Sequence, residues 1–111
     1  MKSKRTRVGK QQMLAPIYPG DILRDDFLRP LSLSSNRLAA ALDVPANRIA
    51  DIVRGRRTIT ADTAVRLARY FGTSPELWMN LQRDYELRLV RRHRLAEIER
   101  KVRPRKRAAH A

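Results

Sequence analysis

Residues 33–57 constrain the fold of this chain most strongly, because their apolar spacing predicts two short helices joined by a tight turn. A serine, Ser34 or Ser35, is expected to cap the first helix. The inward side of that helix carries Leu38, Ala39 and Leu42. The second helix repeats the spacing with Ala46, Ile49, Ala50 and Val53. Helices this short are not stable alone and are expected to pack against each other. The pattern is typical of a helix-turn-helix, whose second helix enters the DNA major groove.

Polar side chains occupy the opposite side of the second predicted helix, namely Asn47, Arg48, Asp51 and Arg54. The Asn47 amide is suited to an adenine edge, and Arg48 to guanine or phosphate. Two interpretations of Asp51 stay open. Its carboxylate could accept a hydrogen bond from a cytosine amino group, or it could hold Arg48 or Arg54 in an ion pair along the helix.

Arginines are concentrated where the second helix ends, with Arg54, Arg56 and Arg57 surrounding Gly55. Cations there complement the negative end of a helix, but three arginines in four residues exceed that need. We therefore predict contacts with backbone phosphates. At the start of the first helix, the side chains and free N–H groups of residues 34–36, including Ser35 and Asn36, are expected to do the same.

The rest of the chain predicts an all-α fold of about five helices, without convincing strand alternation. Pro19 suits the first turn of an opening helix that Pro30 ends. Thr60 is expected to cap a fourth helix, and Gly72 to close it in the left-handed conformation. A Ser-Pro pair at 74–75 begins a long fifth helix.

One apolar stripe follows the fifth helix and consists of Trp78, Leu81, Tyr85 and Leu89. It has two interpretations, the domain core or a dimer interface. Dimeric helix-turn-helix proteins place their recognition helices about one DNA turn, roughly 34 Å, apart. The helical pattern weakens over 91–94 and resumes until Pro104, so the last helix is expected to extend past the globule.

The formal charge of +14 over 111 residues is concentrated at the two ends. Residues 1–18 hold five cations and no acid, and residues 91–111 hold nine cations against two glutamates. We therefore divide the chain into a disordered basic arm (1–15), a helix-turn-helix domain (16–90) and a basic C-terminal helix extension with a tail (91–111). Such ends favour polyanions: DNA, RNA or an acidic protein face.

Several functional classes find little support in the sequence. There is no cysteine, and His93 and His110 lie in basic surroundings without an acidic constellation, so neither a metal site nor an enzyme is expected. The four glycines form no phosphate loop, and no cofactor is expected. No segment approaches the roughly 20 apolar residues of a membrane span, which favours a cytoplasmic protein without a membrane partner.

Three stretches together resemble a known family: YPGDIL at 18–23, the motif at 33–57, and ITADTAVRLARYFGTSPELWMNLQRDYEL at 59–87. They are similar to HigA-type antitoxins of bacterial toxin–antitoxin modules, a branch of the Xre/Cro-like (lambda-repressor-like) helix-turn-helix group. The resemblance covers about residues 17–89. It implies a homodimer that binds operator DNA upstream of its own operon and represses it. It also implies that the protein neutralises a RelE-like, mRNA-cleaving toxin.

By this resemblance, Ser35, Ala46, Asn47 and Asp51 face bases or the adjacent backbone. By the same resemblance, Arg54 and Arg56 occupy positions that contact DNA phosphates. Ser35 stands where the family commonly has glutamine. The basic ends lie outside the region of resemblance, so the resemblance implies no role for them. Two alternatives remain: a plain helix-turn-helix repressor without a toxin, and an RNA- or ribosome-associated protein whose basic arms are the functional part.

Overall fold

The computed structural model describes residues 16–106, and every regular element in this range is helical. In chain order the elements are α2 (Pro19–Ile22), η1 (Leu23–Leu28), α3 (Ser35–Leu42), α4 (Ala46–Val53), α5 (Ala61–Phe71), α6 (Pro75–His93) and α7 (Leu95–Lys101). The predicted all-α helix-turn-helix fold is confirmed. The predicted N-terminal arm (1–15) and the residues from 107 onward, which include His110, lie outside the described residues.

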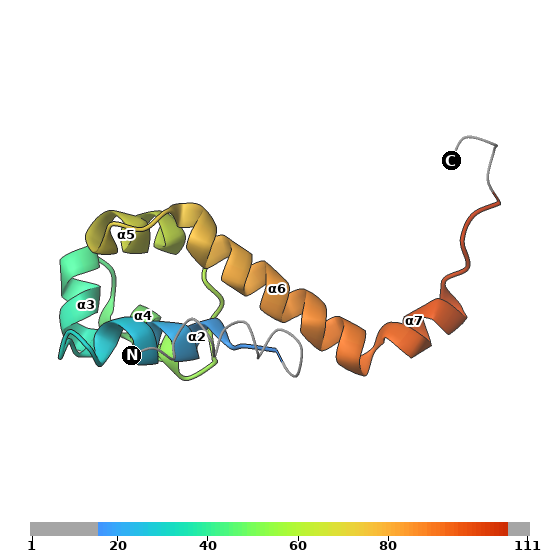
Figure 1. Cartoon of the computed structure of the whole chain (residues 1–111), viewed down its shortest axis with the longest axis horizontal. Helices are drawn as coiled ribbons and strands as arrows, with labels where there is room; N and C mark the ends of the chain where they lie inside the picture. Colours follow the sequence, from blue (N-terminus) through green and yellow to red (C-terminus); the bar gives the residue numbers. More distant parts are fainter. Residues whose placement is uncertain (1–15, 107–111) are drawn as a thin grey trace.

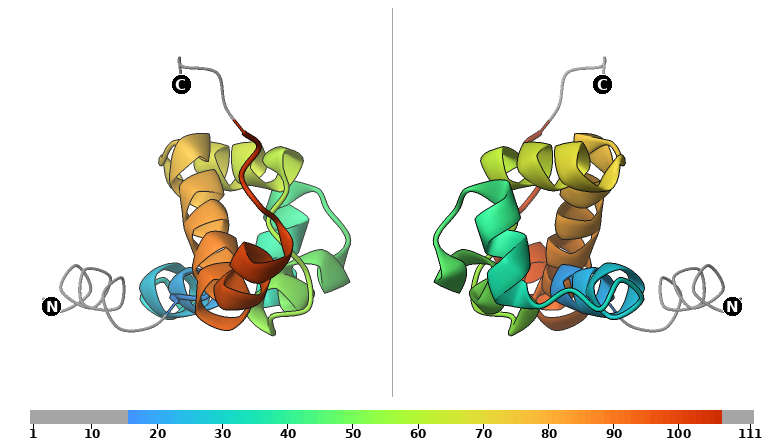
Figure 2. Two further views of the ribbon diagram at one scale, coloured as in Figure 1. Left: turned by 90° about the vertical axis from the view of Figure 1, so that its right-hand side faces the viewer. Right: turned by 90° about the vertical axis from the view of Figure 1, so that its left-hand side faces the viewer.

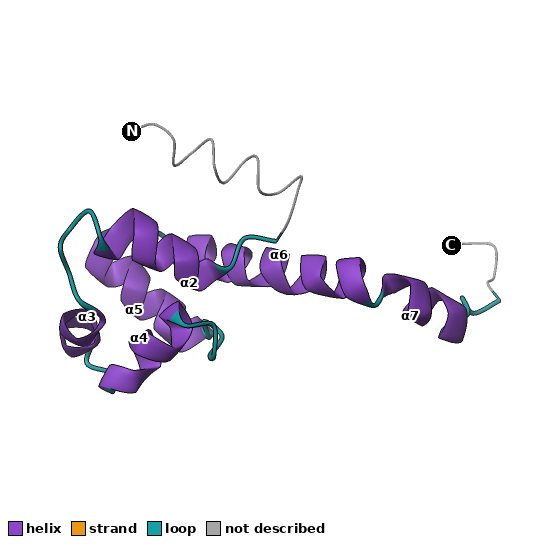
Figure 3. Ribbon diagram, turned by 90° about the horizontal axis from the view of Figure 1, so that it is seen from below, coloured by secondary structure: helices purple, strands orange, loops and turns teal. Residues whose placement is uncertain are grey.

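The molecule is elongated, measuring 54 × 30 × 25 Å. The helices α2 to α5 and the start of α6 form a globule at one end, and α6 leads away from it to α7 (Figure 1). Seen from below, α6 and α7 form a rod that is interrupted by one short break (Figure 3). Among residues 16–106, no helix is both long enough and apolar enough to cross a membrane.

Local capping signals place the helix ends where the sequence predicts them. The hydroxyl oxygens of Ser34, Thr60 and Ser74 each accept the backbone N–H three residues later, at 3.1, 3.4 and 3.1 Å. Ser34 rather than Ser35 is therefore the cap of α3. Gly72 closes α5 with φ +75°, and Asp43 closes α3 in the same left-handed region with φ 60°.

The opening helix differs from its prediction, because its α-helical part covers only α2 and continues as the π-helix η1. In η1 the hydrogen bonds span five residues, as from the Arg29 N–H to the Arg24 carbonyl at 2.9 Å. This wider turn puts Leu23 and Leu28, five positions apart, on the same buried side. Pro30 lies in the turn that follows.

One contiguous core joins these helices. Its buried members are Leu23, Leu28, Leu38, Ala39, Leu42, Ile49, Ile52, Ile59, Ala64, Leu67, Ala68 and Trp78. Trp78 has 0% exposure, with Phe27 and Phe71 beside its ring at centroid distances of 4.9 and 6.4 Å. Its indole N–H donates to the Thr73 hydroxyl at 2.9 Å. Of its two interpretations, Trp78 is therefore a core residue and not part of a dimer interface, since it has no surface to offer a second copy.

Gln82 is a buried polar side chain that connects α6 to the segment between α4 and α5. Its Oε1 accepts the Ile59 N–H at 2.9 Å, and its Nε2 donates to Glu86 at 2.9 Å. The buried N–H of Ile59 thus has a partner, which matters because an unpaired buried donor is costly. This contact fixes the course of the chain that leaves α4.

The inward face of α4 differs from the predicted one by a partial rotation. Ile49 and Ile52 are buried, at 0% and 1% exposure, whereas Ala50 and Val53 are half-buried and Ala46 is exposed. The prediction that Ala46 points inward was wrong, and Ile52 was missed. The α4 helix packs between α3 and α2, so its most enclosed line passes through Ile49 and Ile52, which are three positions apart.

Candidate nucleic-acid interface

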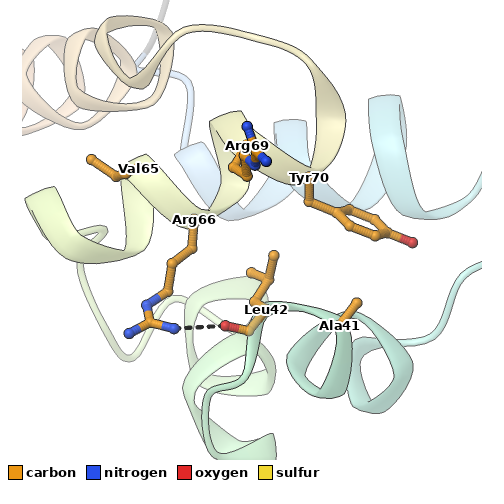
Figure 4. Close-up of a pocket in the computed structure, with 6 residues that line it drawn as sticks. All are labelled: Ala41, Leu42, Val65, Arg66, Arg69 and Tyr70. Atoms are coloured by element: carbon orange, nitrogen blue, oxygen red, sulfur yellow. Dashed lines mark hydrogen bonds between the residues drawn. The ribbon is translucent and has the colours of Figure 1, made fainter.

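The turn between α3 and α4 is fastened to α5 by an arginine. The Arg66 guanidinium donates to the Leu42 carbonyl at 2.8 Å (Figure 4). It also donates to the Asp43 carbonyl at 3.3 Å. These carbonyls lie at the C-terminal end of α3, where helical acceptors have no partner within the helix. Because α5 is itself packed into the core, Arg66 holds the angle between the two motif helices.

The other end of α4 is held by the N-terminal residues of the domain. The Tyr18 hydroxyl donates to the Ile52 carbonyl at 2.6 Å, and the Tyr18 ring meets Tyr85 of α6 edge-on at 5.1 Å. Gly20 lies directly against the Ile52 carbonyl oxygen, with no space for a Cβ atom. Burial, together with Tyr85 and Asp21, raises the pKa of the Tyr18 phenol.

Sequence reasoning missed this support for α4. The available signal was the Tyr-Pro-Gly run itself, since a glycine in the first turn of a helix indicates close approach of another backbone.

The outward side of α4 combines side chains that have internal partners with others that have none. Ala46, Asn47 and Arg54 are exposed, and Arg48 and Asp51 are half-buried. Within residues 16–106, the side chains of Asn47 and Arg54 make no hydrogen bond or ion pair. An amide and a guanidinium without internal partners, on one face of one helix, can form paired hydrogen bonds with bases and phosphates.

The guanidinium group of Arg48 is held by α5. Its Nη1 lies 3.4 Å from Oδ2 of Asp62, which also pairs with the Arg66 Nε at 2.8 Å. Asp62 thus connects the α4 arginine to the arginine that fixes the turn. The half-buried Arg48 is therefore oriented along the edge of α4 rather than free in solvent.

Asp51 also has an internal partner, but not one of those proposed from the sequence. Its carboxylate lies 3.6 Å from the Arg57 guanidinium, so the interpretation as a partner of Arg48 or Arg54 was wrong. The reason is the reversal of the chain at Gly55, which has φ +84°. There the Arg56 N–H donates to the Asp51 carbonyl at 2.7 Å and brings Arg57 back beside α4.

A shallow hollow joins the start of α3 to the outward side of α4. It is lined by Ser34, Ser35, Asn36, Ala50, Val53 and Arg54. The structure thus brings the predicted Ser35, Asn36 and Arg54 together, while Ala46 and Asn47 lie at the far end of the same helix. Exposed Arg56 follows the C-terminal end of α4 and has no ion partner among the described residues.

The interface has the chemistry of a binding surface. The predicted interface residues include four arginines and one aspartate, and Arg57 is the one paired with that aspartate. Within residues 16–106, no group of three or more His, Cys, Asp or Glu side chains could hold a metal ion. A polar, cationic helix face beside free N–H groups suits an anionic, hydrogen-bonding polymer.

The remaining dimer candidates lie on α6 where it leaves the globule. Leu81 packs against the core, Tyr85 is half-buried on Tyr18, and Leu89 is half-buried. Leu87 and Val90, which the sequence analysis did not single out, are each 43% exposed. A dimer interface along Tyr85 and Leu89 stays a prediction.

Two short helices meeting at a left-handed turn, with a free polar face on the second, define a helix-turn-helix domain. Residues 26–78 match the family model HTH_3, described as Helix-turn-helix. The virulence-associated protein I of Dichelobacter nodosus is 51% identical over 82 residues, covering 74% of this chain and 75% of that protein.

Two solved structures extend the comparison. The antitoxin HigA of Pseudomonas aeruginosa, solved with the higBA promoter, is 48% identical with a TM-score of 0.77, covering 80% of this chain and 97% of that one. The antitoxin GraA in complex with its operator is 38% identical with a TM-score of 0.78, covering 86% and 95%. The chain belongs to the Xre-like helix-turn-helix family, in the branch that contains the HigA-type antitoxins.

Proposed function

We propose that this protein is a DNA-binding antitoxin that represses its own toxin–antitoxin operon from the cytoplasm. Its activity is binding alone. The α4 helix enters the major groove of an operator upstream of its own gene, and its outward side chains choose the sequence. Phosphate contacts supply most of the affinity, which makes binding depend steeply on salt.

One observation carries the DNA-binding part: Asn47 and Arg54 are exposed on one face of α4 without partners among the described residues, beside a hollow at the start of α3. In this arrangement Asn47 reads a base edge, and Arg54 holds phosphate together with Ser35 and Asn36. Arg56 adds a second backbone contact. The two similar antitoxins solved with a promoter or an operator support this assignment.

Arg48 and Asp51 have more limited roles in this proposal. The contact with Asp62 orients Arg48 toward one edge of the groove. Asp51 holds Arg57 near the DNA backbone. Because its carboxylate is half-buried, Asp51 can reach a base only at the floor of the major groove. Ala46, at the first turn of α4, allows close approach of the helix to the bases.

The protein acts as a homodimer in this proposal, with the contact on α6 around Tyr85 and Leu89. A two-fold pair places two α4 helices on successive turns of one DNA face. The exposed Leu87 and Val90 widen the apolar surface available for this contact.

The partner protein proposed here is a RelE-like, mRNA-cleaving toxin. The two similar structures are antitoxins, which supports a toxin as the partner, whereas its RelE-like class rests on the resemblance of the sequence alone. A plain repressor would share the DNA-binding half of the function but would have no such partner.

The first experiment compares binding to a duplex from upstream of the protein's own gene with binding to a shuffled duplex of equal length. A marked preference for the upstream duplex, and lower expression of a reporter under that promoter, are expected. Equal affinity for both duplexes would refute the operator proposal.

The second experiment co-expresses the protein with the product of the adjacent reading frame. Relief of growth arrest and co-purification of the two chains are expected. If no neighbouring frame encodes a toxin, or the chains do not associate, the protein is a plain repressor.

A further inference from the structure

The C-terminal part of the molecule carries positive charge that the candidate interface does not use. Residues 88–106, which we call the basic extension, hold nine Lys and Arg residues against Glu97 and Glu99, a formal charge of +7. Half of the formal +14 of the chain therefore lies in these residues, which comprise the end of α6, α7 and the segment after it.

Most of these cations have no internal partner. Glu97 pairs with Arg94 at 3.2 Å and with Lys101 at 3.0 Å. In contrast, Arg91, Arg100 and Arg103 are exposed and contact no acid within residues 16–106. Like charges held close together repel each other, so an excess of this size favours a polyanionic partner.

The composition of the basic extension favours phosphate over other anions. Seven of its nine cations are arginines. The planar guanidinium group forms paired hydrogen bonds with phosphate oxygens and is more weakly hydrated than an ammonium group. No residue of α7 is buried, so this charge is accessible from the solvent.

The course of α6 carries this charge away from the globule, along the longest dimension of the molecule (Figure 1). The helix begins beside α5 and runs to the level at which α2 and α4 lie, so α7 lies at that level but at the far end of the molecule from α4 (Figures 1 and 2). The longest dimension of the molecule is 54 Å. At one base pair per 3.4 Å, about 16 base pairs of duplex extend along such a length.

We propose that the basic extension is a second DNA contact, which binds the phosphate backbone of the duplex whose bases α4 reads. This inference rests on the proposed function, because α4 supplies the duplex at high effective concentration. Each arginine that meets a phosphate releases condensed counterions, which strengthens binding without regard to sequence. The basic extension thus raises affinity, while α4 retains the choice of sequence.

Matched triple variants test this inference. The test variant, Arg91→Gln with Arg100→Gln and Arg103→Gln, removes three unpaired cations from the basic extension. The control variant removes the same formal charge from exposed positions outside it and outside α4, through Arg29→Gln, Arg69→Gln and Arg83→Gln. Of these, Arg29 pairs with Asp25 at 3.5 Å and Arg83 with Asp84 at 3.2 Å, both on the surface, where ion pairs contribute little to stability. Glutamine keeps a comparable helix propensity, and thermal unfolding of both variants should match that of the natural chain.

The measurement is the affinity for the upstream duplex and for a shuffled duplex across a series of salt concentrations. In the test variant, the slope of log K against log salt should become shallower on both duplexes by about two to three for each bound protomer, at roughly 0.9 per lost phosphate contact. Its preference between the duplexes should stay that of the natural chain. The control variant should keep the natural slope.

An unchanged slope in the test variant, or an equal change in the control variant, would overturn the inference. So would a test variant that keeps the natural slope on both duplexes but, in a parallel measurement, loses affinity for an RNA oligonucleotide, which would assign the basic extension to RNA. These outcomes are distinct from failure of the proposed function, in which the natural chain shows no preference for the upstream duplex.

Discussion

Replacing Gly20 by alanine tests how the fold positions α4. A Cβ atom at Gly20 would overlap the Ile52 carbonyl oxygen and press on the Tyr18 ring. That oxygen accepts the Tyr18 hydroxyl at 2.6 Å and the Gly55 N–H at 3.2 Å. Since one colliding group is backbone, a change of rotamer cannot relieve the overlap. The end of α4 must therefore move away from α2.

The magnitude follows from three terms. Overpacking against backbone costs up to about 3 kcal/mol, and weakening two hydrogen bonds adds about 2 kcal/mol. The better helix propensity of alanine returns about 1 kcal/mol. The expected loss for Gly20→Ala is thus about 4 kcal/mol, a large fraction of the roughly 5–15 kcal/mol typical of such domains.

Urea unfolding followed by circular dichroism measures this loss, with Gly72→Ala as the matched control. Gly72 has φ +75°, and no neighbouring atom lies within 4 Å of the place that an alanine methyl group would take, so alanine there meets only backbone strain. That strain costs about 1 kcal/mol. A Gly20→Ala protein that is no less stable than Gly72→Ala would refute the close contact of α2 with α4.

Three further predictions concern α6 and its neighbours. Gln82→Ala should cost about 1–3 kcal/mol in urea unfolding, because it leaves the Ile59 N–H buried without an acceptor; an unchanged midpoint would contradict this. The raised pKa of Tyr18 means that its contribution to stability is complete below pH 10.0, its unfolded value, and is lost as the pH rises through the folded pKa. In Tyr18→Phe, the melting temperature should therefore fall less steeply at alkaline pH than it does in the natural chain. An identical fall in both proteins would contradict this role of Tyr18. Leu89→Glu should shift sedimentation toward the monomer with an unchanged helical circular dichroism spectrum, whereas a retained dimer would exclude this stretch of α6 as the interface.

Features that depend on neighbours in the sequence could be predicted. The caps Thr60 and Ser74 and the left-handed Gly72 each follow from the chemistry of a few adjacent residues, and the structure confirms them. For the first motif helix the sequence left Ser34 and Ser35 open, and the structure selects Ser34. The candidate interface residues on α4 and at the start of α3 could be named for the same reason, since they follow from the spacing within one motif.

Features that depend on tertiary geometry could not be predicted. Whether Ile52 or Val53 is the more buried depends on how α4 lies between α2 and α3, because both are apolar and adjacent. The pairing of Asp51 with Arg57 needs the reversal at Gly55, and the π-helical turn of η1 has no signal in the periodicity. Likewise, the hydrogen bond from Ile59 to Gln82 joins residues 23 positions apart.

The central claim is that the outward side of α4 reads operator DNA. The most direct test measures the affinities of Asn47→Ala and Arg54→Ala for a panel of operator duplexes with single base-pair changes. We predict that Asn47→Ala loses about 1–3 kcal/mol of discrimination at one base pair. Arg54→Ala should instead weaken binding to all duplexes by a similar factor, with a shallower salt dependence. Natural affinity and natural base preference in both variants would contradict the claim.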